Sequence, residues 1–561
     1  MSDDEIELRR LRADGTTGTS LADRLSQLAN KLTWRTPLHR MRLRGRYPLQ
    51  LVDVPADPIP GRAAAGRALL DGRMAHAGES IALDALERGG WRPAFGDYYQ
   101  SFAWLRDLAA AGPRSAGAPV AERIMRRWIA RHGRIPDQTA WRADLWGWRI
   151  LFWTAYAPFI LDTRDADYRK DVLNALARGA RHLDRAADSA GQGLPRVAAW
   201  AGVIAAGLLI PGGDLRTAHG EAGIARALAS AMHGDGGLAS RSPAEQLRLI
   251  ELLAQLRSVY EVRARPPGGA VARALTQAVP ALLAVTLGEG LSSWQGGGPV
   301  GIGRIEAAVA ASGVRARALS EPRDWGYQLL AQGDARLVMD AGPPPVATLS
   351  KGGCASTLAF ELSDAGQRLI VNCGGNAGLP DELTGALRST AAHSTLVVAD
   401  ANSTAILPDG ALGRGVAEVA LTRSETNAGS RIEGSHDGYV RRFGFTHRRR
   451  LLLAADGHGL EGEDRVDPTG RRKPDAVTPL ALRFHVAPDV DIVETADGHG
   501  ALLRPADAPA WQFRANAGTV TVEDSLWIDF VGRPRPTRQI VVSAEAPAAG
   551  LAIGWSLKRV R

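Results

Sequence analysis

Cysteine is almost absent from this chain of 561 residues, which contains only Cys354 and Cys373. So few cysteines exclude a small disulfide-stapled scaffold. If the segment between them is a hairpin that turns at residues 364–367, Ser363 faces Arg368. Cys354 then lies about four residues past the position opposite Cys373, which is too far for a disulfide. We therefore expect no bridge between the two cysteines.

Long hydrophobic runs are also missing. The longest, residues 197–211, is too short and too rich in alanine and glycine to span a bilayer. The N-terminus is acidic and then basic, with neither the apolar segment nor the small-residue cleavage site that a secretory signal needs. The sequence therefore predicts no transmembrane segment and a cytoplasmic location.

Several well-known enzyme motifs do not occur. There is no Gly-x-Gly-x-x-Gly between a strand and a helix, no Walker lysine loop, no Gly-x-Ser-x-Gly and no His-Glu-x-x-His. These absences argue against dinucleotide-binding enzymes, P-loop NTPases, α/β-hydrolases and zinc proteases of the common kinds. The paired carboxylates of glycoside hydrolases stay open, because they pair in space and leave no fixed spacing in a sequence.

Positive charge is in excess, with 68 Lys and Arg against 60 Asp and Glu, a net charge of +8 and a pI near 9.8. This excess is typical of proteins with an anionic partner such as an acidic sugar polymer, nucleic acid or acidic surface. An arginine-rich composition from a GC-rich genome explains it equally well. Residues 34–46 concentrate the cations within a basic N-terminal arm, residues 1–60. We expect this arm to pack on the main body, since no fingerprint of specific nucleic-acid binding accompanies it.

Residues 61–325 follow a helical pattern. Positions 120, 124, 125, 128 and 129 are apolar, the stripe of a helix with one buried face. Further helices are predicted over 144–159, 168–187, 197–209, 215–232, 243–262 and 271–287. Helices in succession without strands pack as antiparallel pairs, and the absence of a fixed repeat favours a ring over a solenoid. Trp141, Trp146, Trp148 and Trp153 would either line a sugar-binding groove or, as helical spacing favours, pack in the core.

Residues 326–561 change to a period of two. Strands are predicted over 335–339, 356–362, 368–372, 394–398, 416–422, 448–454, 480–486 and 526–530. Their short, turn-punctuated spacing is typical of an antiparallel β-sandwich. The expected fold class is therefore multidomain α+β, with an N-terminal incomplete (α/α) toroid followed by the sandwich.

Chemically versatile side chains stand next to these predicted strands. Arg388-Ser-Thr-Ala-Ala-His393 comes directly before an alternating apolar strand, and Asp437-Gly-Tyr439 is followed by a histidine at 447. In the helical half, Arg241-Ser-Pro243 opens a predicted helix, and a glycine-rich loop ends at Gln295-Gly. These segments resemble those of the heparinase II/III-like polysaccharide lyases, a family whose fold is a helical toroid followed by a β-sandwich.

The resemblance implies β-elimination on an acidic polysaccharide that contains uronic acid. Such a reaction needs a base, an acid, and groups that neutralise the sugar carboxylate. His393, Glu245 and Tyr260 are the candidates for proton transfer. The candidate substrate-binding residues are Arg388, Arg241, Arg196, Asn372, His436, Tyr439 and His447, although histidines in turns and strands such as 436 and 447 commonly satisfy backbone groups instead. Relatives of this kind are usually exported, so the cell envelope or periplasm is the alternative location.

The chain departs from the family pattern where the family binds zinc. Gly352, Cys354 and Ser356 stand at the positions of its His, His and Asp ligands, and Asn372 replaces a ligating aspartate. Zinc needs about four donors drawn from Cys, His and carboxylates. We therefore expect no cofactor. The departures support an alternative function, a catalytically degenerate glycan-binding or scaffold protein on the same fold. A further alternative is a binder of anionic polymers that uses residues 34–46.

Overall fold

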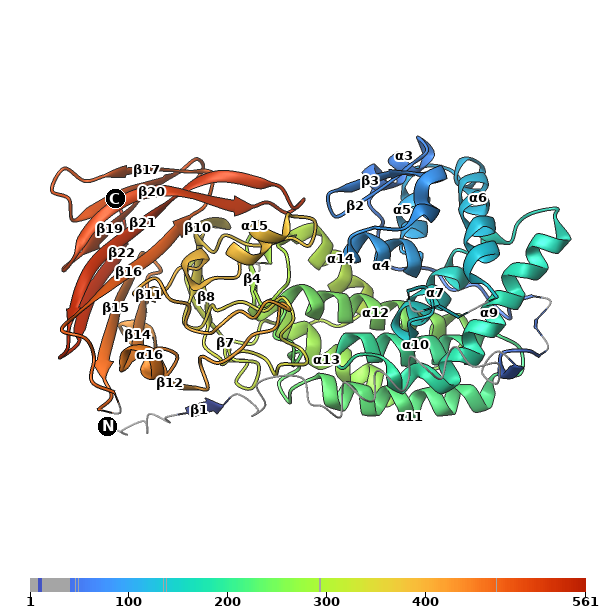
Figure 1. Ribbon diagram of the computed structural model, residues 1–561, viewed down its shortest axis with the longest axis horizontal. Coiled ribbons are helices and arrows are strands. Elements are labelled where there is room, and N and C mark those ends of the chain that lie inside the picture. The colour runs from blue at the N-terminus through green and yellow to red at the C-terminus, as the bar shows by residue number, and fades with distance from the viewer. Residues whose placement is uncertain are drawn as a thin grey trace.

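The computed structural model describes residues 9–12, 41–45, 47–48, 50–134, 136–137, 139–291, 294–470 and 472–560. Helices occupy the first half and two antiparallel sheets the second (Figure 1). Most of the basic segment 34–46, and with it most of the predicted arm, lies outside the described residues. Residues 9–12 of that arm form β1 (Arg9–Arg12), which pairs with the first long strand of the sandwich.

The helical half is an incomplete toroid of antiparallel helices, as the sequence predicted. Its elements are α3 (Ala63–Leu70), β2 (Arg73–His76), β3 (Glu79–Ala82), η1 (Leu83–Arg88), α4 (Pro93–Ser101), α5 (Trp104–Ala111), α6 (Arg114–His132), α7 (Ala143–Ala155), α8 (Ala157–Ile160), α9 (Ala166–Ala186), η2 (Ala187–Ser189), α10 (Leu194–Leu209), α11 (Asp214–Ala231), α12 (Pro243–Val262), α13 (Gly269–Ala284) and α14 (Ile302–Ser312). Within the described residues, none of these helices is long and apolar enough to cross a bilayer.

The long apolar run of the sequence is α10, and it is the buried centre of the toroid. It packs against α7, α11 and α12. Small residues permit the closest of these approaches: a Cβ on Gly147 of α7 would lie 2.0 Å from the carbonyl oxygen of Ala198 on α10. Alanine and glycine in this run therefore serve helix packing, not membrane insertion.

The predicted tryptophan groove is a core. Trp141, Trp146 and Trp153 are at most 1% exposed and Trp148 is 8% exposed, which confirms the core interpretation over the sugar platform. Arg149 lies among them, with its guanidinium carbon 4.2 Å from the ring centres of both Trp128 and Trp146. Its nitrogens donate to the backbone carbonyls of residues 100 and 140. Cation–π contacts and carbonyl oxygens together hold this buried charge.

Two antiparallel sheets form the sandwich. One has the order β1-β12-β13-β14-β15-β22-β19-β18-β17, and the other β20-β21-β16-β10-β9-β8-β7, with β11 paired to β16. The strands are β7 (Tyr327–Gln332), β8 (Ala335–Asp340), β9 (Phe360–Asp364), β10 (Gln367–Val371), β11 (Leu396–Val398), β12 (Glu418–Thr426), β13 (Gly429–His436), β14 (Phe445–Ala454), β15 (Gly459–Pro468), β16 (Val477–Val486), β17 (Val490–Glu494), β18 (Gly500–Pro505), β19 (Trp511–Ala515), β20 (Thr519–Ile528), β21 (Pro534–Pro547) and β22 (Leu551–Arg559).

The predicted hairpin after residue 363 is present, with Ser363 opposite Arg368. The strand before the turn begins later than predicted, because Leu358 adopts a left-handed φ of 66° that breaks extended pairing. A register shift after Arg368 then alters the later pairing. Cys354 and Cys373 are both buried free thiols.

The toroid and the sandwich are in contact at several places, two of which involve short strands. A small sheet of β4 (Thr286–Leu287), β5 (Gly290–Leu291) and β6 (Val300–Gly301) carries the chain from α13 to α14, at the centre of Figure 1. At the other contact, the turn between β2 and β3 meets the loop before α15 (Asp381–Ala386). There the side chain of Arg92 donates to the carbonyl oxygens of Gly378 and Leu379.

Candidate functional site

His393 follows a 3-10 turn, η3 (Thr390–Ala392), and its ring points into the protein. It is 1% exposed, its Nδ1 lies 2.7 Å from the carbonyl oxygen of Ser389, and its ring stacks on Trp294 at a centroid distance of 6.4 Å. Nδ1 therefore carries the hydrogen that Ser389 accepts. Burial lowers the pKa of His393 to about 4, so the imidazole is neutral at pH 7. A side chain this buried cannot touch a polymeric substrate unless the junction opens.

Arg241 binds a carboxylate, but that carboxylate belongs to the protein. Its Nη2 lies 2.5 Å from Oδ1 of Asp340, and both side chains are at most 5% exposed. Further guanidinium hydrogen bonds go to the backbone carbonyls of Trp325, Gly342 and Pro343. The predicted anchor for a sugar carboxylate thus fastens the toroid to the start of the sandwich.

Gln295 completes the network around Asp340. Its Nε2 donates to Ser356 Oγ at 3.1 Å and to Asp340 Oδ2 at 3.3 Å, while its Oε1 accepts the backbone N–H of Cys354 at 3.1 Å. Ser356 in turn donates to Asp340 Oδ2 at 2.6 Å. These polar groups are buried and satisfied by one another, so they are not available to a ligand.

The other two predicted arginine anchors, Arg388 and Arg196, donate their hydrogen bonds to backbone carbonyl oxygens. Arg388 is 9% exposed and donates to the carbonyl oxygens of Gly353 and Gly410, both at 2.7 Å. Burial without a carboxylate partner lowers its pKa. Arg196 donates to the carbonyl oxygen of Ala190 at the start of its own helix. Arg388 holds two loops together and Arg196 caps a turn.

Glu245 and Tyr260 share one helix but lie far apart on it. They are separated by fifteen positions of α12, which at 1.5 Å per residue is about 22 Å. Ser242 caps this helix by accepting the N–H of Glu245, so Glu245 occupies the first-turn position where a capping box places an acid. Tyr260 is 1% exposed and donates to Glu221 Oε1 at 2.9 Å. At this distance Glu245 and Tyr260 do not meet at one reacting centre, so at most one of them could act beside His393.

Asn372 ties three segments of the sandwich together. It is fully buried, its Nδ2 donates to Glu361 Oε1 at 3.1 Å, and its Oδ1 accepts the N–H of Ser394 at 2.9 Å. The amide therefore has structural partners on both of its ends.

His436 and His447 belong to a buried chain of hydrogen bonds. Gly438 donates its N–H to His436 Nδ1, the two imidazoles meet at 3.2 Å, and His447 Nε2 lies 2.8 Å from Asp464 Oδ1. Arg449 also binds both oxygens of Asp464. Tyr439 is 1% exposed and donates to a backbone carbonyl. The structural interpretation of these three predicted residues fits their contacts.

Two clusters of reactive side chains could not be predicted from the sequence, because their members are distant in the chain. Cys373 Sγ lies 3.5 Å from His485 Nδ1, yet burial raises the pKa of the thiol to about 11, so it is not an activated nucleophile. In the toroid, the ring of His76 stacks on Tyr98 at 4.1 Å. Tyr98 donates to Asp107 at 2.8 Å, and Arg62 contacts both Asp107 and His76.

Comparison with known proteins agrees with this architecture. The family described as "Heparinase II/III-like, C-terminal" matches residues 314–556. FtsZ-localized protein C of Caulobacter vibrioides (strain NA1000 / CB15N) is 32% identical over 556 residues, which cover 93% of this chain and 92% of the relative. The chain belongs to the heparinase II/III-like family.

Among solved structures, heparinase III has a TM-score of 0.66 at 13% identity, over 95% of this chain and 89% of that one. A heparan sulfate lyase HepC mutant from Pedobacter heparinus has a TM-score of 0.60 at 14% identity, over 93% and 87%. At such identities the likeness concerns the fold.

The residues at the zinc positions of this heparinase II/III-like protein do not fit a metal. Ser356 donates a hydrogen bond to Asp340 and Asn372 donates one to Glu361, while Gly352 has no side chain. Among the described residues, no three His, Cys, Asp or Glu side chains come together as a metal site. These side chains therefore do not form a zinc site.

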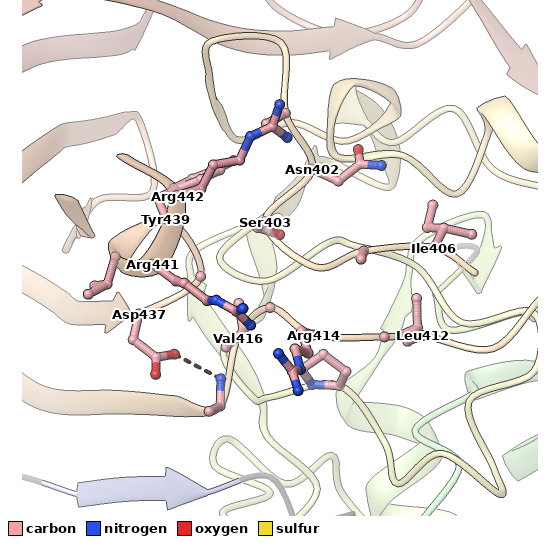
Figure 2. A pocket seen from close by; sticks show the side chains of 18 of the residues that line it. Asn402, Ser403, Ile406, Leu412, Arg414, Val416, Asp437, Tyr439, Arg441 and Arg442 are labelled. Atoms are coloured by element: carbon pink, nitrogen blue, oxygen red, sulfur yellow. Dashed lines mark hydrogen bonds between the residues drawn. The ribbon is translucent and has the colours of Figure 1, made fainter. Parts of the chain in front are cut away.

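A large open pocket lies beside the junction, on the sandwich of this heparinase II/III-like protein. Its volume is about 1180 Å³, and it lies between the loop 400–417, the turn 437–443 and the segment 344–347 (Figure 2). Next to that segment, Thr348 hydrogen-bonds Gln192 of the toroid at 3.0 Å. Tyr439 contributes to the pocket wall, while the other predicted site residues do not line it. The accessible space and the predicted catalytic groups are thus in different places.

Proposed function

We propose that this heparinase II/III-like protein acts by binding and does not carry out β-elimination. The burial of His393 carries this proposal. The reaction needs a base and an acid at one sugar ring, together with a cation for the uronate carboxylate. Here the imidazole is covered, and Glu245 and Tyr260 are about 22 Å apart along their helix. Of the three predicted cations, Arg241 is neutralised by Asp340, while Arg388 and Arg196 donate to backbone carbonyls.

We further propose that the chain localises to FtsZ. Support comes from the name of its curated relative, FtsZ-localized protein C, to which it is 32% identical over 93% of its length. Because the similarity extends over nearly the whole chain, it includes both the toroid and the sandwich. Catalysis needs a few groups in fixed positions, whereas a binding scaffold needs only its surface, so such a role is compatible with the loss of the site.

A lyase that acts on acidic polysaccharide is the second candidate. His76 and Tyr98 favour it, because a neutral imidazole and a phenol lie side by side with a partly accessible ring and a nearby arginine at 62. Burial lowers the pKa of His76 to about 3. Burial also raises the pKa of Tyr98 well above 10, so the phenol keeps its proton, which Asp107 accepts. This pair could donate or accept a proton only weakly near pH 7.

A fluorescent fusion of the full chain tests the localisation. In cells of the source organism, we expect the fusion to coincide with FtsZ and to disperse when FtsZ is depleted. The fluorescent protein alone is the control. A signal that is spread evenly through the cell, and that ignores FtsZ depletion, would contradict the proposal.

A further inference from the structure

Four arginines line the open pocket beside the junction. Arg414 comes from the long loop, Arg441 and Arg442 from α16 (Val440–Phe443), and Arg472 from the segment after β15. All four are exposed. Within the part of the chain that the structure describes, no ion pair with a carboxylate involves any of them, although side chains such as Arg442, stacked on Phe443, do have other contacts.

Arginines on the neighbouring strand, in contrast, do form ion pairs. On β14, Arg448 pairs with Glu433, Arg449 with Asp464, and the next arginine along with Glu463. Arginines a few residues away thus have carboxylate partners from the chain itself. The pocket arginines have no such carboxylate partner within the described residues.

The acidic side chains in the pocket do not neutralise these cations. Asp437 accepts the backbone N–H groups of Ala417 and Glu418 at 2.8 and 3.1 Å, and the first of these bonds is drawn in Figure 2. Its charge therefore serves to hold the start of β12. Asp400 is the other acid in the lining. With four arginines against two aspartates, the pocket is positive, and it would attract an anion.

Much of the remaining wall is aliphatic. Pro344, Val346, Ile406 and Val440 line it and are half-buried, whereas Leu412 and Val416 are buried behind the surface. The aromatic residues of the lining are Tyr439, which is buried with its hydroxyl on a backbone carbonyl, and Phe443, which is half-buried and stacked by Arg442. A sugar chain is usually gripped by exposed aromatic faces. Aliphatic surface beside guanidinium groups suits a polypeptide with acidic and aliphatic side chains better.

We propose that this pocket binds an acidic, extended polypeptide segment of a partner protein. Its carboxylates would meet Arg414 and Arg441, whose guanidinium groups point toward the same part of the pocket in Figure 2. An aliphatic side chain would pack on Ile406 and the other half-buried aliphatic side chains of the wall. At about 1180 Å³ the pocket exceeds the usual range for small ligands, about 300–1,000 Å³, and has room for several residues. This inference rests on the proposed function as a binding protein and names the chemistry of its partner.

Fluorescence anisotropy with a short labelled peptide of alternating glutamate and leucine tests the proposal. The full chain should bind this peptide with an affinity that falls as salt increases, and should bind an alternating lysine–leucine peptide far more weakly. The double variant Arg414→Glu with Arg441→Glu should bind the acidic peptide at least about tenfold more weakly. Both positions are exposed, so melting temperature and circular dichroism should stay those of the parent.

The matched control makes the same change in net charge elsewhere. Arg535→Glu with Arg538→Glu alters two exposed arginines of β21, which are not part of the pocket lining, and should leave binding unchanged. Equal binding of the two peptides, or equal losses in both double variants, would overturn the proposal. So would heparan sulfate oligosaccharides that bind more tightly than the acidic peptide through Arg414 and Arg441. The peptide measurement uses purified protein, whereas localisation to FtsZ is measured in cells. A failure to bind the peptide can therefore be distinguished from a failure to localise.

Discussion

Replacing Arg241 by methionine should lower the free energy of unfolding by about 3–5 kcal/mol, because it leaves a buried carboxylate without its cation. Asp340 is fully buried and would keep only the hydrogen bonds from Ser356 and Gln295. The guanidinium also donates to several backbone carbonyls between residues 325 and 343, and these acceptors would lose their donor. The loss should appear as a lower midpoint in urea denaturation of the full chain.

Two further variants show whether the unpaired charge is the cause. Arg241→Met combined with Asp340→Asn removes the charge from both sides and should recover part of the lost stability. Arg538→Met, at an exposed ion pair with Asp524, should change stability little. A midpoint for Arg241→Met as close to the parent as that of Arg538→Met would mean that the pair does not hold the two halves together.

Acidification from pH 7 to pH 4 should lower the free energy of unfolding, because buried histidines must take up protons. Burial lowers the pKa of His393 to about 4, lowers that of His485 to about 3, and lowers those of His436 and His447. A histidine in the unfolded chain takes up its proton near pH 6.5, so in this window the unfolded state binds more protons than the folded state. Stability is therefore fully present above about pH 6.5 and is lost as the pH falls toward the folded-state pKa. His393 alone accounts for a loss of up to about 3 kcal/mol by pH 4.

Thermal melts between pH 7 and pH 4 measure this effect. Arg449 and His447 lower the pKa of the buried Asp464 to about 2. Protonation of this carboxylate should therefore lower the stability further only below about pH 4. The variant His393→Gln should show a shallower decline between pH 6.5 and pH 4 than the parent. A melting temperature that stays constant from pH 7 to pH 5 would argue that these rings are hydrated in solution.

Much of the fold follows from periodicity. Apolar residues at helical spacing predicted the helix 243–262, which is α12 (Pro243–Val262) with the same bounds. The hairpin opposing Ser363 and Arg368 followed from its turn residues. Strands such as β15 (Gly459–Pro468) were missed, because glycine and acidic residues interrupt its alternation and cross-strand pairing decides its structure.

The site was harder to predict, because burial depends on residues distant in the sequence. His393 is covered by Trp294, and Arg241 finds Asp340 about a hundred residues away. Neither contact leaves a local pattern. Glu245 was different: Ser242-Pro-Ala-Glu has the sequence pattern of a capping box. Its spacing to residue 260 already placed the two groups far apart on one helix.

The polar groups at the junction of this heparinase II/III-like fold serve its structure. Arg241, Gln295 and Asp340 join the two halves and satisfy one another. The accessible positive charge lies instead in the neighbouring pocket around Arg414 and Arg441. A binding role uses that surface and makes no demand on the buried junction.

The most direct test of the central claim is a lyase assay that follows the ultraviolet absorbance of unsaturated uronate. The purified full chain is incubated with heparan sulfate, hyaluronan, alginate and bacterial exopolysaccharides, with and without added zinc, beside a known heparinase as positive control. We expect no rise in absorbance on any of these glycans. A rise that disappears in His393→Ala or His76→Ala, while both variants stay folded, would contradict the account and identify the chain as a lyase with rearranged catalytic groups.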